Sequence, residues 1–387
     1  MRLEIYSPWS PGSVDDHYLR ELISQFRADH GYVANIRVTH SLRAAQIGLT
    51  GGDPPDALYA NPGRELYTRW VVAGQMESLD DVYDHYGLRQ ALPSGLIDLV
   101  SFDDQVWSMP LSVSRSNVLW YNRQVFAANA IQPADLQTFE GWEAAAMKLQ
   151  AAGITPLAFG STEPWVIWQL FESILVGTAG PEKYLGLWNG TTDWRGPEVR
   201  LALQNLQMML RYANPDHSRT EWSQAYRRVV DGQAAMFLMG DWMVREFSNS
   251  GFGSYGHTTP PGTAGTFVVW LDAFSQPSGT SHPQVAKEFL AFLGSKPAQE
   301  FFNRSRGSGS LCPRLDCDYS GFGIHSRTSL ADYETDRLVP SLARAMASSE
   351  DWTADFASAL QNFLRERNIA LAQSELDSAC RAAKICQ

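Results

Sequence analysis

The feature that most constrains the fold is an alternation of strand-like and helix-like segments near the start of the chain. Residues 3–7 read as a strand, and residues 16–29 read as an amphipathic helix because their apolar side chains recur at helical spacing. A strand-like segment at 35–40 and a helix-like segment at 41–52 repeat this order, and 56–60 reads as a short buried strand. Strands that alternate with helices predict an α/β fold with a parallel sheet.

A second α/β region is predicted to begin near residue 112. Before it, residues 100–113 read as a hairpin with Asp103 and Asp104 at its turn. Residues 116–126 read as a strand, and 138–153 as a helix capped by Thr138. Further segments are a strand at 266–274 after a Gly/Pro-rich loop, a helix at 282–295 and a mostly helical C-terminal part.

The net charge argues against a nucleic-acid partner, and the hydropathy argues against a membrane-spanning segment. The 387 residues carry a net charge of −11 and no basic run. Because affinity for nucleic acid comes mainly from phosphate neutralisation by Lys and Arg, we expect no nucleic-acid partner. No stretch of 18 or more consecutive apolar residues is present, so no segment is predicted to span a membrane.

The cysteines predict disulfides. Cys312 and Cys317 form a C-x4-C pair, and Cys380 and Cys386 form a C-x5-C pair. An even count suits one or two disulfides in an exported protein, with three pairings open. Free thiols and a zinc site are the alternatives, although the spacing does not fit the common C-x2-C zinc knuckles.

Motifs of enzymes are missing from the sequence. It has no phosphate-binding P-loop, no H-E-x-x-H and no dinucleotide-binding G-x-G-x-x-G after a strand. The eight histidines are scattered without metal-ligand spacing. We therefore predict no catalytic residues, no metal and no cofactor.

Tryptophans at predicted loops and strand ends indicate a sugar site. The chain has 13 tryptophans, and three of them follow separate predicted strands, where crevices form in α/β sheets. An indole offers a flat apolar face to the C–H face of a sugar ring, and Asp, Asn and Arg can bond the hydroxyls. The alternative is that these tryptophans belong to the core. The candidates are Trp9, Trp165, Trp222, Trp242 and Trp270.

Three carboxylates accompany these tryptophans. Asp15 and Asp241 stand where helix N-caps are expected, and either could cap a helix and also contact a ligand. Asp272 lies inside an apolar strand, where a carboxylate is costly unless it is paired. It is expected at the strand's end, in a structural ion pair or facing a polar ligand, of which we favour the ligand.

Four segments carry a resemblance to a known family. They are "GGDPPDALYANPGRELYTRWVVAGQMESLDDVY" (51–83), "LIDLVSFDDQVWSMPLSVSRSNVLWYN" (96–122), "RVVDGQAAMFLMGDW" (228–242) and "TFVVWLDAF" (266–274). In this combination the chain resembles the extracellular solute-binding proteins of bacterial ABC sugar importers, most of all the glucose/galactose-type, monosaccharide-binding group. The candidate ligand-binding residues are Trp9, Asp15, Tyr59, Asn61, Ser114, Trp165, Trp222, Asp241, Trp242, Trp270, Asp272 and Arg344.

The resemblance implies a periplasmic-binding-protein-like fold: two α/β lobes joined by a multi-segment hinge, with the ligand cleft between them. We expect crossings near 110–114, 262–268 and 310–316. The N-terminal lobe would then comprise 1–111 and 267–312, and the C-terminal lobe 113–265 and 316–387.

The resemblance also implies a function. It is binding of a small carbohydrate, a mono- or disaccharide, and its delivery to the transmembrane permease of an ABC importer. The location implied is periplasmic or extracellular, with or without a lipid anchor, and a monomer is expected.

The sequence departs from the glucose-binding pattern at Asn61 and Arg344, where glucose-binding members tend to have His. An arginine is always charged and presents a fork of donors. One alternative is therefore a two-lobe protein for an acidic or non-sugar solute. A less favoured alternative is a glycosidase that uses Asp241 and Asp272.

Overall fold

The computed structural model describes residues 2–31 and 35–386 and divides them into two compact units. Unit 1 comprises residues up to Ser114 together with 270–334, and unit 2 comprises 115–269 and the residues from Thr335 onward. The chain therefore passes between the units after Ser114, after Val269 and after Glu334.

The third passage differs from the expected crossing near 310–316. Residues 316–334, which we assigned to the C-terminal lobe, group with unit 1. Hydrogen bonds hold this segment there: the Tyr333 hydroxyl donates to the Pro313 carbonyl at 2.8 Å, and the Cys312 backbone N–H donates to the Tyr319 hydroxyl at 3.0 Å.

Unit 1 is built on a mixed sheet. Strands β2, β1 and β3 are parallel, as the alternation predicted, and the C-terminal part of β11 pairs with β3 in the antiparallel sense, with Phe274 opposite Tyr59. Strand β6 also pairs with β11. The elements are β1 Arg2–Tyr6, α1 Val14–Asp29, β2 Asn35–Thr39, α2 Leu42–Gly51, β3 Ala57–Ala60, α3 Arg64–Leu66, the π-helix η1 Tyr67–Val71, α4 Asp80–His85, α5 Leu88–Ala91, α6 Ser94–Val100, β4 Ser101–Phe102, β5 Gln105–Val106, β6 Met109–Arg115, β11 Thr266–Ser275, α14 Pro283–Leu293, α15 Lys296–Ser305 and α16 Ile324–Thr335.

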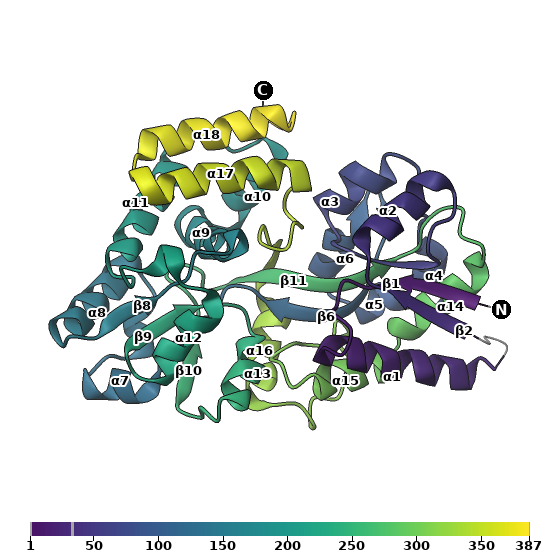
Figure 1. Ribbon diagram of the computed structural model, residues 1–387, viewed down its shortest axis with the longest axis horizontal. Helices are drawn as coiled ribbons and strands as arrows, with labels where there is room; N and C mark the ends of the chain where they lie inside the picture. The colour runs from purple at the N-terminus through teal and green to yellow at the C-terminus, as the bar shows by residue number, and fades with distance from the viewer. Residues whose placement is uncertain (1, 32–34, 387) are drawn as a thin grey trace. The chain divides into compact units, whose positions relative to one another are not determined.

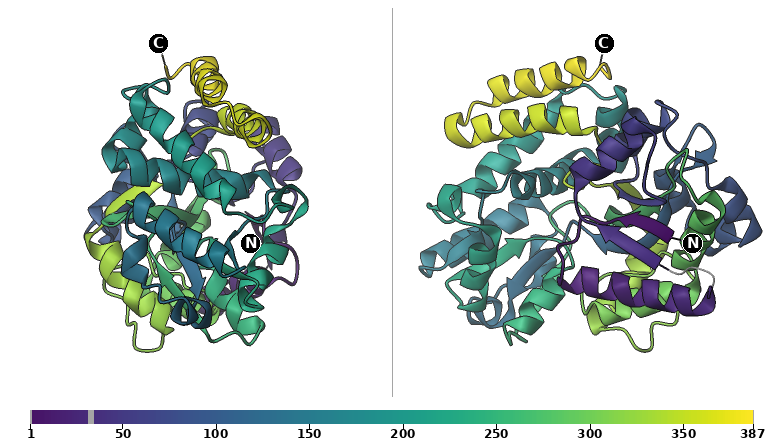
Figure 2. Two further views of the ribbon diagram at one scale, coloured as in Figure 1. Left: turned by 90° about the vertical axis from the view of Figure 1, so that its left-hand side faces the viewer. Right: turned by 45° about the vertical axis from the view of Figure 1, so that its right-hand side comes forward.

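Unit 2 has a sheet of four strands in the order β10-β7-β9-β8, and β12 pairs in parallel with the N-terminal part of β11. Helices α17 and α18 lie side by side in Figures 1 and 2. The elements are β7 Leu119–Asn122, α7 Arg123–Ala128, the 3-10 helix η2 Pro133–Leu136, α8 Phe139–Ala151, β8 Thr155–Ala158, α9 Pro164–Ala179, α10 Pro181–Asn189, α11 Pro197–Arg211, the 3-10 helix η3 His217–Arg219, α12 Trp222–Val230, β9 Ala234–Leu238, α13 Met243–Asn249, β10 Tyr255–Thr258, β12 Arg337–Pro340, α17 Glu350–Glu366 and α18 Ile369–Ala382.

The predicted helix caps and the predicted hairpin turn are present in the structure. Ser41 caps α2 by accepting from the Ala44 N–H, and Thr138 caps α8 by accepting from the Gly141 N–H. The hairpin of β4 and β5 turns through Asp103 and Asp104, both with positive φ, as a two-residue hairpin turn requires.

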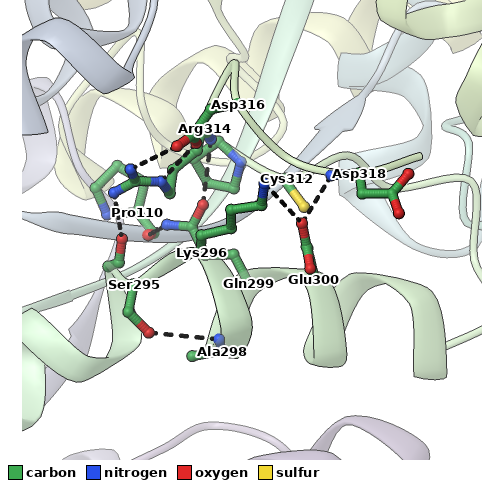
Figure 3. A network of polar contacts seen from close by, with 12 residues as sticks. Pro110, Ser295, Lys296, Ala298, Gln299, Glu300, Cys312, Arg314, Asp316 and Asp318 are labelled. Carbon is green, nitrogen blue, oxygen red and sulfur yellow. Dashed lines mark hydrogen bonds and ion pairs between the residues drawn. The ribbon is translucent and has the colours of Figure 1, made fainter. Parts of the chain in front are cut away.

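One of the predicted disulfides is present, between Cys380 and Cys386 at the C-terminal end of α18. Cys312 and Cys317 are thiols. They flank a turn in which Arg314 and Asp316 form a two-point ion pair, with atom distances of 2.8 and 3.0 Å. Figure 3 shows this turn against the first turns of α15, where Gln299 accepts from the Arg314 N–H at 3.2 Å.

Tryptophans are the largest side chains in the core of unit 2. Trp120, Trp142, Trp194 and Trp352 are fully buried, and Trp188 packs against the last two of them. None of these residues was among the ligand candidates, whose tryptophans are all only partly buried.

Candidate functional site

Unit 1 contains a buried charged cluster around Asp272 in β11. The Tyr59 hydroxyl, from the neighbouring strand β3, donates to Asp272 Oδ1 at 2.5 Å. Arg306 Nη1 donates to Asp272 Oδ2 at 2.8 Å, and Arg306 Nε donates to Asp15 Oδ1 at 2.8 Å. Asp272 thus forms a structural ion pair, which was one of the three expectations for it.

Arg306 is the central residue of this cluster, and the sequence analysis missed it. It is the C-cap residue of α15, and its side chain is 9% exposed. Burial opposes its charge, but the carboxylates of Asp272 and Asp15 outweigh that effect and raise the pKa of the Arg306 guanidinium. The signal that could have indicated it is the carboxylate within an apolar strand, because such a group requires a cation elsewhere in the chain.

Trp9 forms the aromatic part of the unit 1 cluster. It follows β1, and its ring centroid lies 5.2 Å from that of Tyr59 and 5.5 Å from that of Phe302. The Arg306 guanidinium lies 5.8 Å from the Trp9 ring centroid and 4.9 Å from that of Phe302. These distances are in the range of cation–π contacts. Aromatic and charged groups therefore meet here, with the indole partly exposed.

Asp15 is not the helix cap that its position suggested. Ser13 is the N-cap of α1 and accepts from the Asp16 N–H, whereas Asp15 lies in the first turn. A serine at this position satisfies the same backbone donor. The Asp15 carboxylate is thereby available to Arg306, which lies 291 residues away in the chain.

The other candidates of unit 1 are placed on neighbouring elements. Asn61 directly follows β3 and is partly buried. Ser114 is buried near the end of β6, and Trp270 is a partly buried residue of β11. Both lie next to points where the chain passes between the units.

Unit 2 brings three of the candidate tryptophans together. Trp165 lies in the first turn of α9, Trp222 begins α12, and Trp242 is the N-cap residue of α13. The ring centroid of Trp165 lies 6.2 Å from that of Trp222 and 6.4 Å from that of Trp242. All three rings are partly exposed.

Gly240 makes room for one of these rings. The φ of Gly240 is not positive, so the backbone conformation does not require a glycine here. Instead, a Cβ at position 240 would lie 2.1 Å from Cζ3 of Trp242, because the indole folds back over the backbone. The glycine is therefore required for the close approach of the ring.

Asp241 is not a helix cap either. The N-cap residue of α13 is Trp242, and it makes no side-chain cap hydrogen bond. Asp241 is fully buried, and its Oδ2 accepts from the Arg115 N–H at 2.8 Å, while its own N–H donates to the Arg115 carbonyl at 3.0 Å. It therefore fixes the strand end that precedes Trp242.

Arg344 lies in a turn after β12 that a buried glutamate holds. Glu172 of α9 accepts from the Leu342 N–H at 2.6 Å and the Ala343 N–H at 3.1 Å. It also accepts from the hydroxyls of Ser116 and Ser341. Burial raises the pKa of Glu172 to about 7, although these donors favour its charged form.

The described residues contain neither a candidate metal site nor a membrane-spanning helix. Within residues 2–31 and 35–386, no group of three or more His, Cys, Asp or Glu side chains could hold a metal ion. No helix in the same ranges is both long and apolar enough to cross a membrane.

Comparison with known proteins gives a consistent result. Residues 11–300 match the family described as bacterial extracellular solute-binding protein. An uncharacterised ABC transporter extracellular-binding protein of Pyrococcus horikoshii, PH1214, is 30% identical, over 98% of this chain and 87% of that protein. The xylose/arabinose-binding protein XacG of Haloferax volcanii is 27% identical, over 89% of this chain and 77% of that protein.

A solved structure shows the same fold. The bacterial solute receptor AcbH, described as having an exclusive substrate preference for β-D-galactopyranose, superimposes with a TM-score of 0.86. The alignment covers 98% of both chains at 17% identity. This likeness confirms the predicted α/β fold of the periplasmic-binding-protein type.

Proposed function

Because the chain belongs to the family of bacterial extracellular solute-binding proteins, we propose that it binds a small carbohydrate and delivers it to the membrane permease of an ABC importer. This family is the one that the sequence resembles, and its members are extracellular or periplasmic, as we expected for this protein. The observation that carries the carbohydrate proposal is the group of three partly exposed tryptophans in unit 2.

The tryptophans support sugar binding because of their geometry. Three indoles at three helix N-termini pack against the core of unit 2 but remain partly exposed, in contrast to the fully buried tryptophans of the same unit. Sugar rings stack on exposed indole faces, and their hydroxyls need polar partners. Unit 1 contains an aromatic and polar group of its own, in which Trp9 lies next to Tyr59 and near the Asp15 and Asp272 carboxylates, and this supports the same class of ligand.

The protein acts by binding alone in this proposal, as a monomer and without a nucleic-acid partner. The pair of carboxylates that we considered for a glycosidase has other partners: Asp241 is fully buried against the backbone of Arg115, and Asp272 is paired with Arg306. We expect sugar binding to drive a hinge motion at the three chain passages, as in other proteins that close on a ligand.

A calorimetric and thermal-shift screen tests the proposal. The panel contains glucose, galactose, xylose, arabinose, disaccharides and uronic acids. Because a ligand that binds the folded state raises its stability by mass action, one neutral sugar should raise the melting temperature saturably and bind with about −8 kcal/mol, a micromolar dissociation constant. Binding of uronic acids alone would instead favour the acidic-solute alternative and a role for Arg344.

Enzyme activity has its own test. Incubation with oligosaccharides should leave the concentration of reducing ends unchanged. Their release, and its loss in an Asp272→Asn variant, would contradict the binding-only proposal.

A further inference from the structure

A cavity of about 430 Å³ lies in unit 2, and none of the candidate sugar-binding residues lines it. Its lining comes from the last turns of α11 and from the residue that ends α17, and Figure 1 shows these helices in the same part of the unit. The lining residues are Gln204, Gln207, Met208, Leu210, Arg211 and Arg367. The volume is in the range of small-molecule sites.

The backbone at Arg367 does not favour an arginine. Arg367 is the C-cap residue of α17, with φ 55° and ψ 25°, and its N–H donates to the Phe363 carbonyl at 2.9 Å. This left-handed conformation is the usual place of glycine at a helix end, because a Cβ strains it by about 1 kcal/mol. The side chain of Arg367 therefore needs an explanation other than its backbone.

No carboxylate among the described residues pairs with the guanidinium of Arg367. Its Nη1 is buried and has no hydrogen-bond partner within the described ranges. Burial lowers the pKa of Arg367, as expected for a charge that no nearby carboxylate balances. The other arginine of the cavity, Arg211, is paired with Glu143 at 3.0 Å. Since a buried donor without a partner is costly, a bound acceptor group at this nitrogen would stabilise the protein.

The rest of the lining indicates the chemistry of such a ligand. The lining contains no carboxylate, so nothing in it repels an anion. Gln207 is held at the helix end, where its Nε2 donates to the Arg367 carbonyl at 3.5 Å, and Gln204 offers a second amide. Met208 and Leu210 are buried and apolar. The lining thus combines one unbalanced cation, amide groups and an apolar wall.

We propose that this cavity binds a small anionic molecule, with its carboxylate or phosphate group on the Arg367 guanidinium. A planar guanidinium forms two parallel hydrogen bonds with either group, which satisfies the buried Nη1. The site is separate from the proposed sugar site and does not depend on it.

The test uses inorganic phosphate and citrate as probes, at constant ionic strength set with chloride. The melting temperature of the wild type should rise saturably by about 3 °C or more, and calorimetry should show one site. Arg367→Gly removes the guanidinium and relieves the left-handed strain, so it should fold at least as well without an anion and lose the shift. Arg365→Ala removes an exposed arginine of the same helix and should keep it.

Two results would overturn the proposal. One is the absence of saturable binding of either probe to the wild type. The other is an equal shift in Arg367→Gly, which would assign the effect to general salt stabilisation. Sugar affinity should be the same in Arg367→Gly and the wild type, because the two sites share no residue.

Discussion

Two buried carboxylates, one in each unit of this protein, are stabilised in opposite ways. In unit 1, Asp272 is paired with the cation of Arg306, which also holds Asp15. In unit 2, Glu172 is surrounded by uncharged donors, two serine hydroxyls and two backbone N–H groups, and no cation pairs with it among the described residues. The units differ in their aromatic groups as well, with one tryptophan beside the charges of unit 1 and three away from such a network in unit 2. We therefore expect polar contacts to matter in unit 1 and stacking to matter in unit 2.

Removing one partner of the unit 1 ion pair should have the largest effect. Asp272→Ala leaves the buried Arg306 without its main partner, so the free energy of unfolding should fall by about 3–5 kcal/mol. Denaturant unfolding measures this loss. The triple variant Asp15→Asn/Asp272→Leu/Arg306→Met is the control and should recover much of the stability, because it removes all three charges of the cluster. A loss below about 1 kcal/mol in Asp272→Ala would show that the pair is not a buried one.

The buried Glu172 of unit 2 should make the free energy of unfolding depend on pH. The pKa of Glu172, about 7 in the folded protein, lies above its unfolded value of 4.5. Its contribution to stability is therefore fully present below pH 4.5 and is lost as the pH rises through 7, a change of about 3 kcal/mol. Unfolding of the wild type and Glu172→Gln between pH 4.5 and 8 should show this difference in slope. Parallel curves would mean that the surrounding donors keep Glu172 ionised throughout.

Stacking in unit 2 should dominate sugar affinity. Trp242→Ala removes a partly exposed indole, so the affinity for the sugar found in the screen should fall at least about 30-fold, or about 2 kcal/mol, while the fold persists. Trp352→Ala is the matched control from the core, since that ring is fully buried; it should lower the free energy of unfolding by about 3–5 kcal/mol. Unchanged affinity in Trp242→Ala would remove the stacking role.

The smallest effect is expected for a variant that shifts the Trp242 indole without removing it. Gly240→Ala puts a methyl group against the Trp242 ring, so the ring must shift, and affinity should fall by about 1 kcal/mol or more, roughly fivefold. Gly253→Ala is the control, because a Cβ there meets no atom within 4 Å. Equal affinities in both variants would show that the ring position over Gly240 does not matter for the ligand.

Much of the fold was predictable because its signals are local. The caps Ser41 and Thr138 and the turn at Asp103 and Asp104 act within a few residues of their partners. The β/α alternation of the first sixty residues predicted the parallel strands of unit 1. The prediction that Asp15 and Asp241 are helix caps was wrong. In the sequence, a carboxylate before a helix is the same whether it bonds to the helix backbone or to a group far along the chain.

By itself, the sequence determined the fold class, the family and the residue types of the candidate sites, since periodicity, capping and family motifs are properties of short segments. Only the tertiary structure decided which groups meet. The partner of Asp15 lies 291 residues away and the partner of Asp241 lies 126 residues away. Burial then decides the charge of each group, and burial depends on residues from every part of a unit. For that reason Arg306, Glu172 and Arg367 became candidates only once their surroundings were known.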